Sequence, residues 1–248
     1  MDIKLIANFK MHFSNQQMLD WCQNFISIAP ADKLDKIVLA PADTNLSLVK
    51  DFLNQRGINI RLASQNAVSS RKVALTGEVS VDMLEGLADY LIIGHSEQRT
   101  FNPQTDEELA LRIHQAVKLN ITPVICFGDS LEDFEAGDEF IYEQVQSLVN
   151  SLEESELKKI IIAYEPIWAI GSGKLPTALQ IDTKLKLISG IINSKISETA
   201  YVFDRMLYGG SVSSSNIGQL KESKLARGFL IGGASLDFRE LAKLLSLV

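Results

Sequence analysis

The stretch IIIAYEPIWAIGSGK, residues 160–174, begins with an apolar run that is typical of a strand buried on both faces. The run ends on a carboxylate, Glu165, and Pro166 follows at once, so the hydrogen-bonding ladder cannot continue. Bulky apolar residues and two glycines then form a loop that could fold over the acid. A Glu at a strand end is often only a polar terminus, but this combination predicts a candidate base beside a candidate lid.

Other short apolar runs have the same character and alternate with helical patterns. Two of the predicted helices begin with a capping box, formed by Thr105 with Glu108 and by Thr177 with Gln180. The predicted strands comprise residues 3–10, 36–40, 58–63, 90–94, 123–127, 160–163, 202–208 and 228–231.

Eight strands that alternate with helices favour an α/β fold, a (β/α)8 barrel. The 248 residues fit one large domain, and no Pro/Gly/Ser-rich interval is long enough to be a linker, so we expect a single domain over residues 1–248. A doubly wound sheet is the alternative, but the first strand lacks the glycine motif G-x-G-x-x-G before its helix.

Composition limits the classes of partner. The net charge is −7, and no segment supplies the concentrated basic surface that nucleic-acid binding needs. A small anion is still possible, because one lysine and a few backbone N–H groups can hold it. No apolar run approaches the length of a membrane span, and the first residues lack the layout of a signal peptide. We therefore expect no nucleic acid, no membrane and a cytoplasmic protein.

The cysteines and histidines do not predict a metal site. Cys22 and Cys126 match neither a metal knuckle nor a disulfide framework, so we expect buried thiols. His12, His95 and His114 are not at ligand spacing, and no carboxylate cluster joins them.

In a (β/α)8 barrel the active site lies at the C-terminal ends of the strands, so polar residues there are the candidates. Side chains two residues apart on a strand point to the same face, so we expect Asn8 and Lys10 to point the same way. The candidates in chain order are Asn8, Lys10, His95 with Glu97, Glu165, the run Tyr208-Gly209-Gly210-Ser211, and Gly232-Gly233.

A base, a possible acid, a cation and two glycine turns together suggest proton transfer on a small phosphorylated compound. Glycine lets backbone N–H groups approach an anion, and the last two loops of this fold are where phosphate sites recur. Each residue alone has a structural interpretation, and only their convergence on one face favours a site. Gly171-Ser172-Gly173-Lys174 is not a P-loop, because Trp168 and Leu175 stand where that motif needs Gly and Ser/Thr.

Several motifs resemble the triosephosphate isomerase family in order and over the whole chain. They are Asn8-Phe9-Lys10-Met11, Ile92-Ile93-Gly94-His95-Ser96-Glu97, residues 163–174, Leu207-Tyr208-Gly209-Gly210-Ser211-Val212 and Gly232-Gly233-Ala234-Ser235-Leu236, with Gln65-Asn66 and Thr76-Gly77-Glu78 in addition. The resemblance implies the TIM-barrel fold and the interconversion of dihydroxyacetone phosphate and glyceraldehyde 3-phosphate through an enediol(ate), without cofactor or metal.

The resemblance also assigns roles to residues. Glu165 would be the base and His95 the neutral electrophile, which is the established pattern of this family. Lys10 would balance negative charge. The supporting and binding residues that it implies are Glu97 and Ser96 beside the catalytic groups, Asn8 and Lys10 for positioning the substrate, and Gly171, Ser211, Gly232 and Gly233 for the phosphate.

The family is typically dimeric, and the resemblance implies a homodimer through the loop of residues 65–78, which begins at Gln65 and ends at Glu78. Thr76 would lie nearest the partner's site. The same resemblance gives the loop 166–174 the role of a lid that excludes water.

The sequence departs from the family pattern beside the site and at the lid. Phe9, His12 and Gln98 replace Trp, Asn and Arg, and the sequence does not settle whether His12 contacts the site. Asp129 replaces a Glu that the family uses to hold the lid's Trp when open, and Leu175-Pro176 replaces Thr-Ala at the far hinge. Because proline restricts its own φ and the preceding residue, these changes concern the lid's motion more than the chemistry.

Two alternatives stay open from the sequence. A weakened relative kept as a binding protein is opposed by the intact set Asn8, Lys10, His95 and Glu165, although the hinge changes allow it. Another phosphate-binding barrel enzyme, such as an aldolase, would need a Schiff-base lysine, for which Lys10 is the strand-end candidate.

Overall fold

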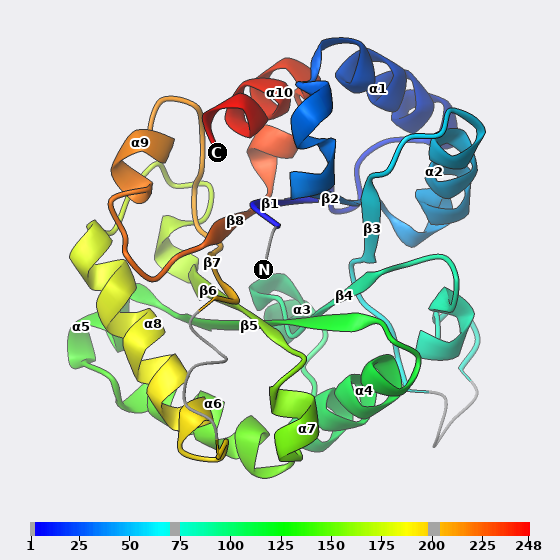
Figure 1. Ribbon diagram of the computed structural model, residues 1–248. Helices are drawn as coiled ribbons and strands as arrows, with labels where there is room; N and C mark the ends of the chain where they lie inside the picture. The colour runs from blue at the N-terminus through cyan, green and yellow to red at the C-terminus, as the bar shows by residue number, and fades with distance from the viewer. Residues whose placement is uncertain (1–2, 70–74, 198–203) are drawn as a thin grey trace.

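The computed structural model describes residues 3–69, 75–197 and 204–248 (Figure 1). Its described residues contain eight parallel strands that pair in sequence order, and β1 closes the sheet by pairing with β8. The strands are β1 (Leu5–Asn8), β2 (Ile37–Ala40), β3 (Arg61–Ser64), β4 (Tyr90–Ile93), β5 (Thr122–Asp129), β6 (Ile161–Pro166), β7 (Met206–Tyr208) and β8 (Gly228–Ile231). The predicted (β/α)8 barrel is therefore confirmed.

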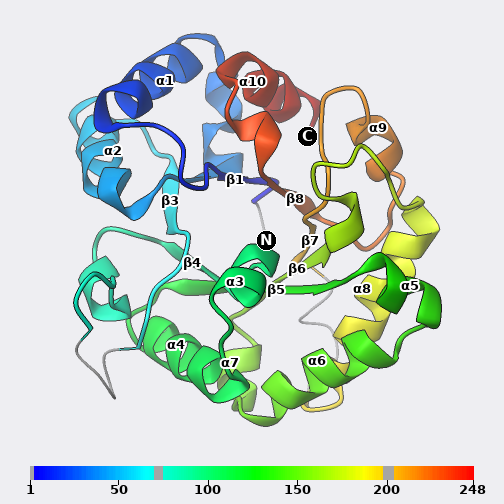
Figure 2. The ribbon, with the colours of Figure 1, turned by 180° about the vertical axis from the view of Figure 1, so that it is seen from behind.

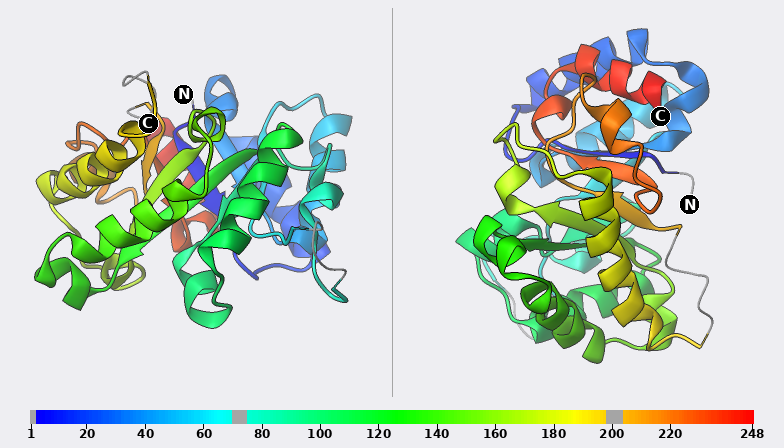
Figure 3. Two further views of the ribbon diagram at one scale, coloured as in Figure 1. Left: turned by 90° about the horizontal axis from the view of Figure 1, so that it is seen from below. Right: turned by 90° about the vertical axis from the view of Figure 1, so that its left-hand side faces the viewer.

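Helices surround this barrel on the outside, as the edge-on views of Figure 3 show. The α-helices are α1 (Asn15–Ile28), α2 (Asp43–Gln55), α3 (Ser96–Phe101), α4 (Asp106–Lys118), α5 (Leu131–Ala136), α6 (Glu139–Asn150), α7 (Glu154–Leu157), α8 (Ala178–Asn193), α9 (Ile217–Leu220) and α10 (Phe238–Leu247). Short 3-10 helices are η1 (Ala31–Lys36), η2 (Val81–Leu84), η3 (Ile167–Ala169) and η4 (Gly233–Ser235). In Figure 2, α3 lies near the centre of the ring, in front of the strands.

The core has two layers, which the alternation of strand side chains creates. In β6, Ile161 and Ala163 belong to the apolar cluster inside the barrel, whereas Ile162 and Tyr164 belong to the larger cluster between strands and helices. Glu165 is the next residue on the inward face, so the sequence places its carboxylate inside the barrel at the C-terminal end of the strand.

Both predicted capping boxes are present, at the start of α4 and of α8. The predicted third strand, by contrast, begins three residues too early. Gly57 has φ +63°, its N–H donates to Asn54 O, and Ile58 N–H donates to Leu53 O, so these residues close α2 with a C-terminal cap before the strand begins at Arg61.

Other strand boundaries also differ from the prediction. The first strand ends at Asn8, and Lys10 has the left-handed φ of 52°. Residues 202 and 203 of the predicted seventh strand lie outside the described residues, and β7 begins at Met206. Pro166 forms the last pair of β6, with Asp129, so the strand continues three residues beyond the predicted range 160–163 and includes Glu165. The single-domain prediction stays a prediction.

Candidate active site

A cavity of about 270 Å³ opens at the C-terminal ends of the strands. The loops after β1, β4, β6, β7 and β8 line it, as expected for this fold. Most of the residues singled out from the sequence line this one cavity: Asn8, Lys10, His95, Glu165, Gly171, Ser211, Gly232 and Gly233. Ser96 and Glu97 do not line it, but each contacts a residue that does, as the contacts below describe.

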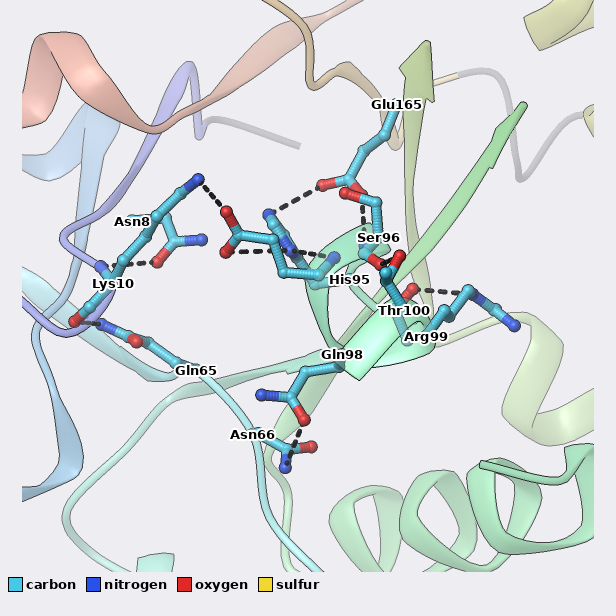
Figure 4. A network of polar contacts seen from close by, with 12 residues as sticks. Asn8, Lys10, Gln65, Asn66, His95, Ser96, Gln98, Arg99, Thr100 and Glu165 are labelled. Carbon is cyan, nitrogen blue, oxygen red and sulfur yellow. Dashed lines mark hydrogen bonds and ion pairs between the residues drawn. The ribbon is translucent and has the colours of Figure 1, made fainter. Parts of the chain in front are cut away.

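Glu165 is the most deeply buried acid of the cavity, with 1% of its surface exposed. Figure 4 shows its carboxylate between β6 and α3, where Oε2 accepts a hydrogen bond from the Ser96 backbone N–H at 2.9 Å. Its other oxygen, Oε1, lies 3.3 Å from His95 Nε2, yet it has no hydrogen-bond partner among the described residues. A buried carboxylate oxygen without a hydrogen-bond partner costs free energy. Because no other described group occupies this oxygen, it can accept a proton.

His95 is fixed by its place at the start of α3, where it is the N-cap. Its Nδ1 accepts the backbone N–H of Glu97 at 3.2 Å, which satisfies one of the free N–H groups at the helix start. Because a backbone N–H can only donate, the ring proton in this arrangement is on Nε2, which faces Glu165. The imidazole therefore presents a hydrogen-bond donor to the cavity.

Strand alternation does not explain why Lys10 lies at the site, because Lys10 follows the end of β1 and its backbone has a left-handed conformation. Its backbone N–H donates to Asn8 Oδ1 at 3.0 Å, and its carbonyl accepts Gln65 Nε2 at 2.8 Å. Its ammonium reaches Glu97 Oε1 at 2.5 Å. The Lys10 side chain is about one quarter exposed and is held at the cavity wall by this ion pair with Glu97.

Two glycines allow the chain to approach Glu165 closely. A Cβ at Gly128, its partner on β5, would lie 2.1 Å from the Glu165 carbonyl oxygen. A Cβ at Gly209 would lie 2.8 Å from Glu165 Cγ. Neither position has room for a side chain, so both glycines help to set where the carboxylate lies.

Cys126 is a neighbour of Glu165 that the sequence reasoning did not identify. It is fully buried inside the barrel, and burial, followed by the nearby Glu165 charge, raises the pKa of its thiol. The predicted burial of both cysteines is confirmed. The signal that was available is spacing, because Cys126 lies two residues before Gly128, on the same face of β5.

The loop after β6 forms one wall of the cavity through Ile170 and Gly171. The Trp168 ring packs on Phe134 of α5, with ring centres 5.2 Å apart, and its Nε1 is buried without a hydrogen-bond partner among the described residues. Ser172 Oγ donates to Trp168 O at 2.8 Å. The loop is thus anchored to α5 by ring packing.

Asp129, near this loop, binds other groups than Trp168. Tyr164 donates its hydroxyl to Asp129 Oδ1 at 3.0 Å, and Lys184 Nζ lies 3.4 Å from Oδ2. Burial raises the pKa of Asp129, while Tyr164 and Lys184 act in the opposite direction. This acid therefore belongs to a buried network with Tyr164 and Lys184.

The described residues contain neither a metal-binding cluster nor a helix suited to a membrane. Across residues 3–69, 75–197 and 204–248, no group of three or more His, Cys, Asp or Glu side chains is placed to hold a metal ion. No helix in the described part of the chain has the length and apolar character needed to cross a membrane.

Comparison with known proteins identifies relatives along nearly the whole chain. Residues 3–248 match the family model described as triosephosphate isomerase. A triosephosphate isomerase of Mesomycoplasma hyopneumoniae (strain 232) is 38% identical over 250 residues, which cover 97% of each chain. One from Corynebacterium efficiens is 34% identical over 246 residues, 97% of this chain and 94% of that protein. One from Ligilactobacillus salivarius is 34% identical over 236 residues, 94% and 93% of the two chains.

Proposed function

Because the chain belongs to the triosephosphate isomerase family, we propose that Glu165, His95 and Lys10 carry out its reaction. The protein is an isomerase that interconverts dihydroxyacetone phosphate and D-glyceraldehyde 3-phosphate, a step of glycolysis and gluconeogenesis. The observation that supports these roles best is the buried Glu165 carboxylate in the cavity. One of its oxygens has no hydrogen-bond partner in the described part of the chain, and a donor, His95 Nε2, lies beside it.

Glu165 acts as the base. Starting from the ketone, Oε1 removes a proton from C1, the C–H electron pair forms the C1–C2 double bond, and the carbonyl oxygen at C2 gains the negative charge. A proton then moves from the C1 hydroxyl to the C2 oxygen, with His95 Nε2 as the group that relays it, and the negative charge passes to the C1 oxygen. The carboxyl finally returns a proton to C2 as the C1–C2 double bond is lost, and the C1 oxygen becomes the carbonyl oxygen of the aldehyde. Burial and a fixed second oxygen hold the base in place, which general-base catalysis requires.

His95 and Lys10 stabilise the charge that develops on oxygen. The Nε2–H of His95 points into the cavity and donates to the substrate oxygen, because Nδ1 is occupied by the Glu97 N–H. The Lys10 ammonium adds a positive charge at the same wall, and Glu97 keeps it oriented. Donors that are already aimed at the developing charge act without reorganisation.

The phosphate group binds at the side of the cavity that is formed by the loops after β6, β7 and β8. Gly171, Ser211, Gly232 and Gly233 bring backbone from three loops to this side, where little side-chain bulk stands in the way. Asn8 positions the remainder of the substrate. The loop that carries Gly171 closes over it and excludes water, so that the enediolate reacts within the site.

Replacement of Glu165 by Gln tests the base role. Gln has nearly the same shape but cannot accept the proton, so we expect kcat to fall by about 10²–10⁴-fold. Binding of an anion at the phosphate side, measured as stabilisation of the thermal midpoint by inorganic sulfate, is expected to persist. Wild-type turnover in the Glu165→Gln variant would remove Glu165 from the mechanism.

Two observations oppose the other assignments. A Schiff-base aldolase needs a neutral lysine, whereas Lys10 is ion-paired with Glu97 at 2.5 Å. A binding protein without turnover is opposed by the position of Glu165, whose open oxygen lies inside the cavity rather than in a salt bridge with Lys or Arg.

We also propose a homodimer that forms through the loop of residues 65–78, with Thr76 approaching the site of the other subunit. Large apolar side chains are exposed in and beside the described parts of this loop, namely Leu75 (53%), Met83 (61%) and Met11 (94%), and Met11 shares a cavity wall with Gln65. Exposed apolar surface of this kind marks an interaction site. A cytoplasmic location is part of the same proposal, and cell fractionation tests it.

Sedimentation analysis tests the dimer. We expect Met83→Glu to shift the protein towards monomer, because a charge would be buried in the interface. Leu179→Glu is the matched control, since Leu179 is 75% exposed on α8, away from the loop. Equal dimer fractions in the two variants would place the interface elsewhere.

A further inference from the structure

His12 lies in the loop between β1 and α1 and lines the same cavity as the catalytic candidates. Because β1 pairs with β8, the loop that carries His12 lies next to the loop after β8, and Gly232, Gly233 and Leu236 of that loop line the same cavity. This is the side to which the proposed function assigns the phosphate group. The side chain is exposed, so its imidazole can take up a proton from solvent.

The cavity offers few positive charges to a dianionic phosphate group. Lys10 is paired with Glu97, and Glu165 contributes a buried negative charge. The described titratable side chains that line the cavity are Lys10, His12, His95 and Glu165. With His95 engaged through Nδ1, a protonated His12 is the additional positive charge that this wall can supply.

The loop that carries His12 is held in shape, which favours a defined position for the ring. Lys10 and Phe13, on either side of it, have left-handed φ angles of 52° and 74°. Gln65 Nε2 donates to Lys10 O at 2.8 Å, and Asn45 Nδ2 donates to Phe13 O at 3.0 Å. Little loop entropy is therefore lost when a ligand meets His12.

We propose that His12 is a phosphate-binding residue, which in its protonated form contacts the phosphate group of the substrate from the β1–α1 loop. The proposal rests on the assignment of the phosphate to the side of Gly232 and Gly233. It gives this chain a titratable phosphate contact in addition to the backbone N–H groups of the loops after β6, β7 and β8. Exposed ion pairs are weak, so the contribution to anion binding is about two- to fivefold.

Competitive inhibition of isomerisation by inorganic sulfate, measured from pH 5.5 to 8.5, tests this contact. Sulfate remains a dianion over the whole range, so any change comes from the protein. For the wild type we expect the inhibition constant to rise about two- to fivefold from the acidic to the alkaline end of this range, because His12 loses its positive charge. In His12→Gln this part of the rise disappears, and what remains reports His95, Glu165 and Lys10.

Further variants separate charge from structure. His12→Lys keeps a positive charge at every pH of the series and is expected to bind sulfate tightly at pH 8.5 as well. His114→Gln is the control, because it removes a histidine that contacts Glu156 on the outside of the barrel, and it should keep the wild-type profile. For triose phosphate, the loss in His12→Gln should appear mainly in KM, and mainly at the acidic end of the pH range.

A wild-type profile in His12→Gln overturns the inference and leaves the isomerase assignment intact. If the wild type itself shows no turnover, the proposed function fails instead. The same pH series is then measured as stabilisation of the thermal midpoint by sulfate, which needs no turnover and decides on His12 alone.

Discussion

Glu165 accepts one hydrogen bond from the protein backbone, from Ser96 N–H to Oε2 at 2.9 Å, and its Oε1 has no described partner. The two oxygens of one buried carboxylate thus have different tasks. Oε2 is fixed by the first turn of α3, whereas Oε1 faces His95 and the cavity. The proposed mechanism depends on this asymmetry, because a base must be both held and available.

Ser96→Pro is expected to remove this hydrogen bond and leave the helix in place. Ser96 is the first residue of α3, where proline is tolerated, and His95 before it has φ −52° and ψ 143°, which a residue before proline can adopt. We predict a fall in kcat of about 10–100-fold. Ser96→Ala keeps the N–H and should stay close to the wild type. Equal kcat values in the two variants would show that the hydrogen bond does not position the base.

Gly209→Ala tests the space around the base. Its Cβ would lie 2.8 Å from Glu165 Cγ, so the carboxylate must move, and a shift of about 1 Å costs on the order of 10²-fold in kcat. Gly218→Ala is the control, because its Cβ would meet no atom within 4 Å. Steady-state kinetics that show similar losses in both variants would contradict the steric account.

Trp168 fluorescence is expected to report closure of the lid. The sequence has two tryptophans, and Trp21→Phe leaves Trp168 as the single emitter. In this structure the Trp168 ring packs on Phe134, and we expect closure over the cavity to break that contact. We predict a change in emission when the equilibrium mixture of the two triose phosphates saturates the protein. Trp168→Phe should show no such change, and a silent Trp168 at saturation would mean that the indole stays on Phe134.

The two thiols are expected to be inert in the native protein. Burial raises the pKa of Cys22 to about 12, and burial with the nearby Glu165 charge raises that of Cys126. At pH 8.5 an unfolded cysteine is about half ionised, so only unfolding should expose two reactive thiols to a colorimetric thiol reagent. The native state keeps these protons where the unfolded state releases them, so stability should fall as the pH rises above about 8.5. Rapid labelling of the folded protein at pH 8.5 would contradict this burial.

Much of the fold was predictable because the deciding signals are local. The apolar run before Glu165 and the capping boxes at Thr105 and Thr177 each depend on neighbours in sequence. The start of β3 was missed because the cap at Gly57 extends α2 by a turn that apolar spacing does not reveal.

The candidate site was predictable as a set of strand ends but not in its internal geometry. Lys10 reaches the cavity from a left-handed position, so the alternation rule did not describe it. The contact between Cys126 and Glu165 depends on the register of β5 against β6, which pairs Gly128 with Glu165. His12 lines the cavity because its loop is pinned by Asn45 and Gln65, which are distant in sequence.

The most direct test of the account is isomerisation of D-glyceraldehyde 3-phosphate by the purified protein, coupled to an NADH-consuming dehydrogenase specific for dihydroxyacetone phosphate, with a chelator present and no metal added. The account predicts turnover that is lost in Glu165→Gln. Absence of turnover in a wild-type protein that still binds sulfate would contradict it.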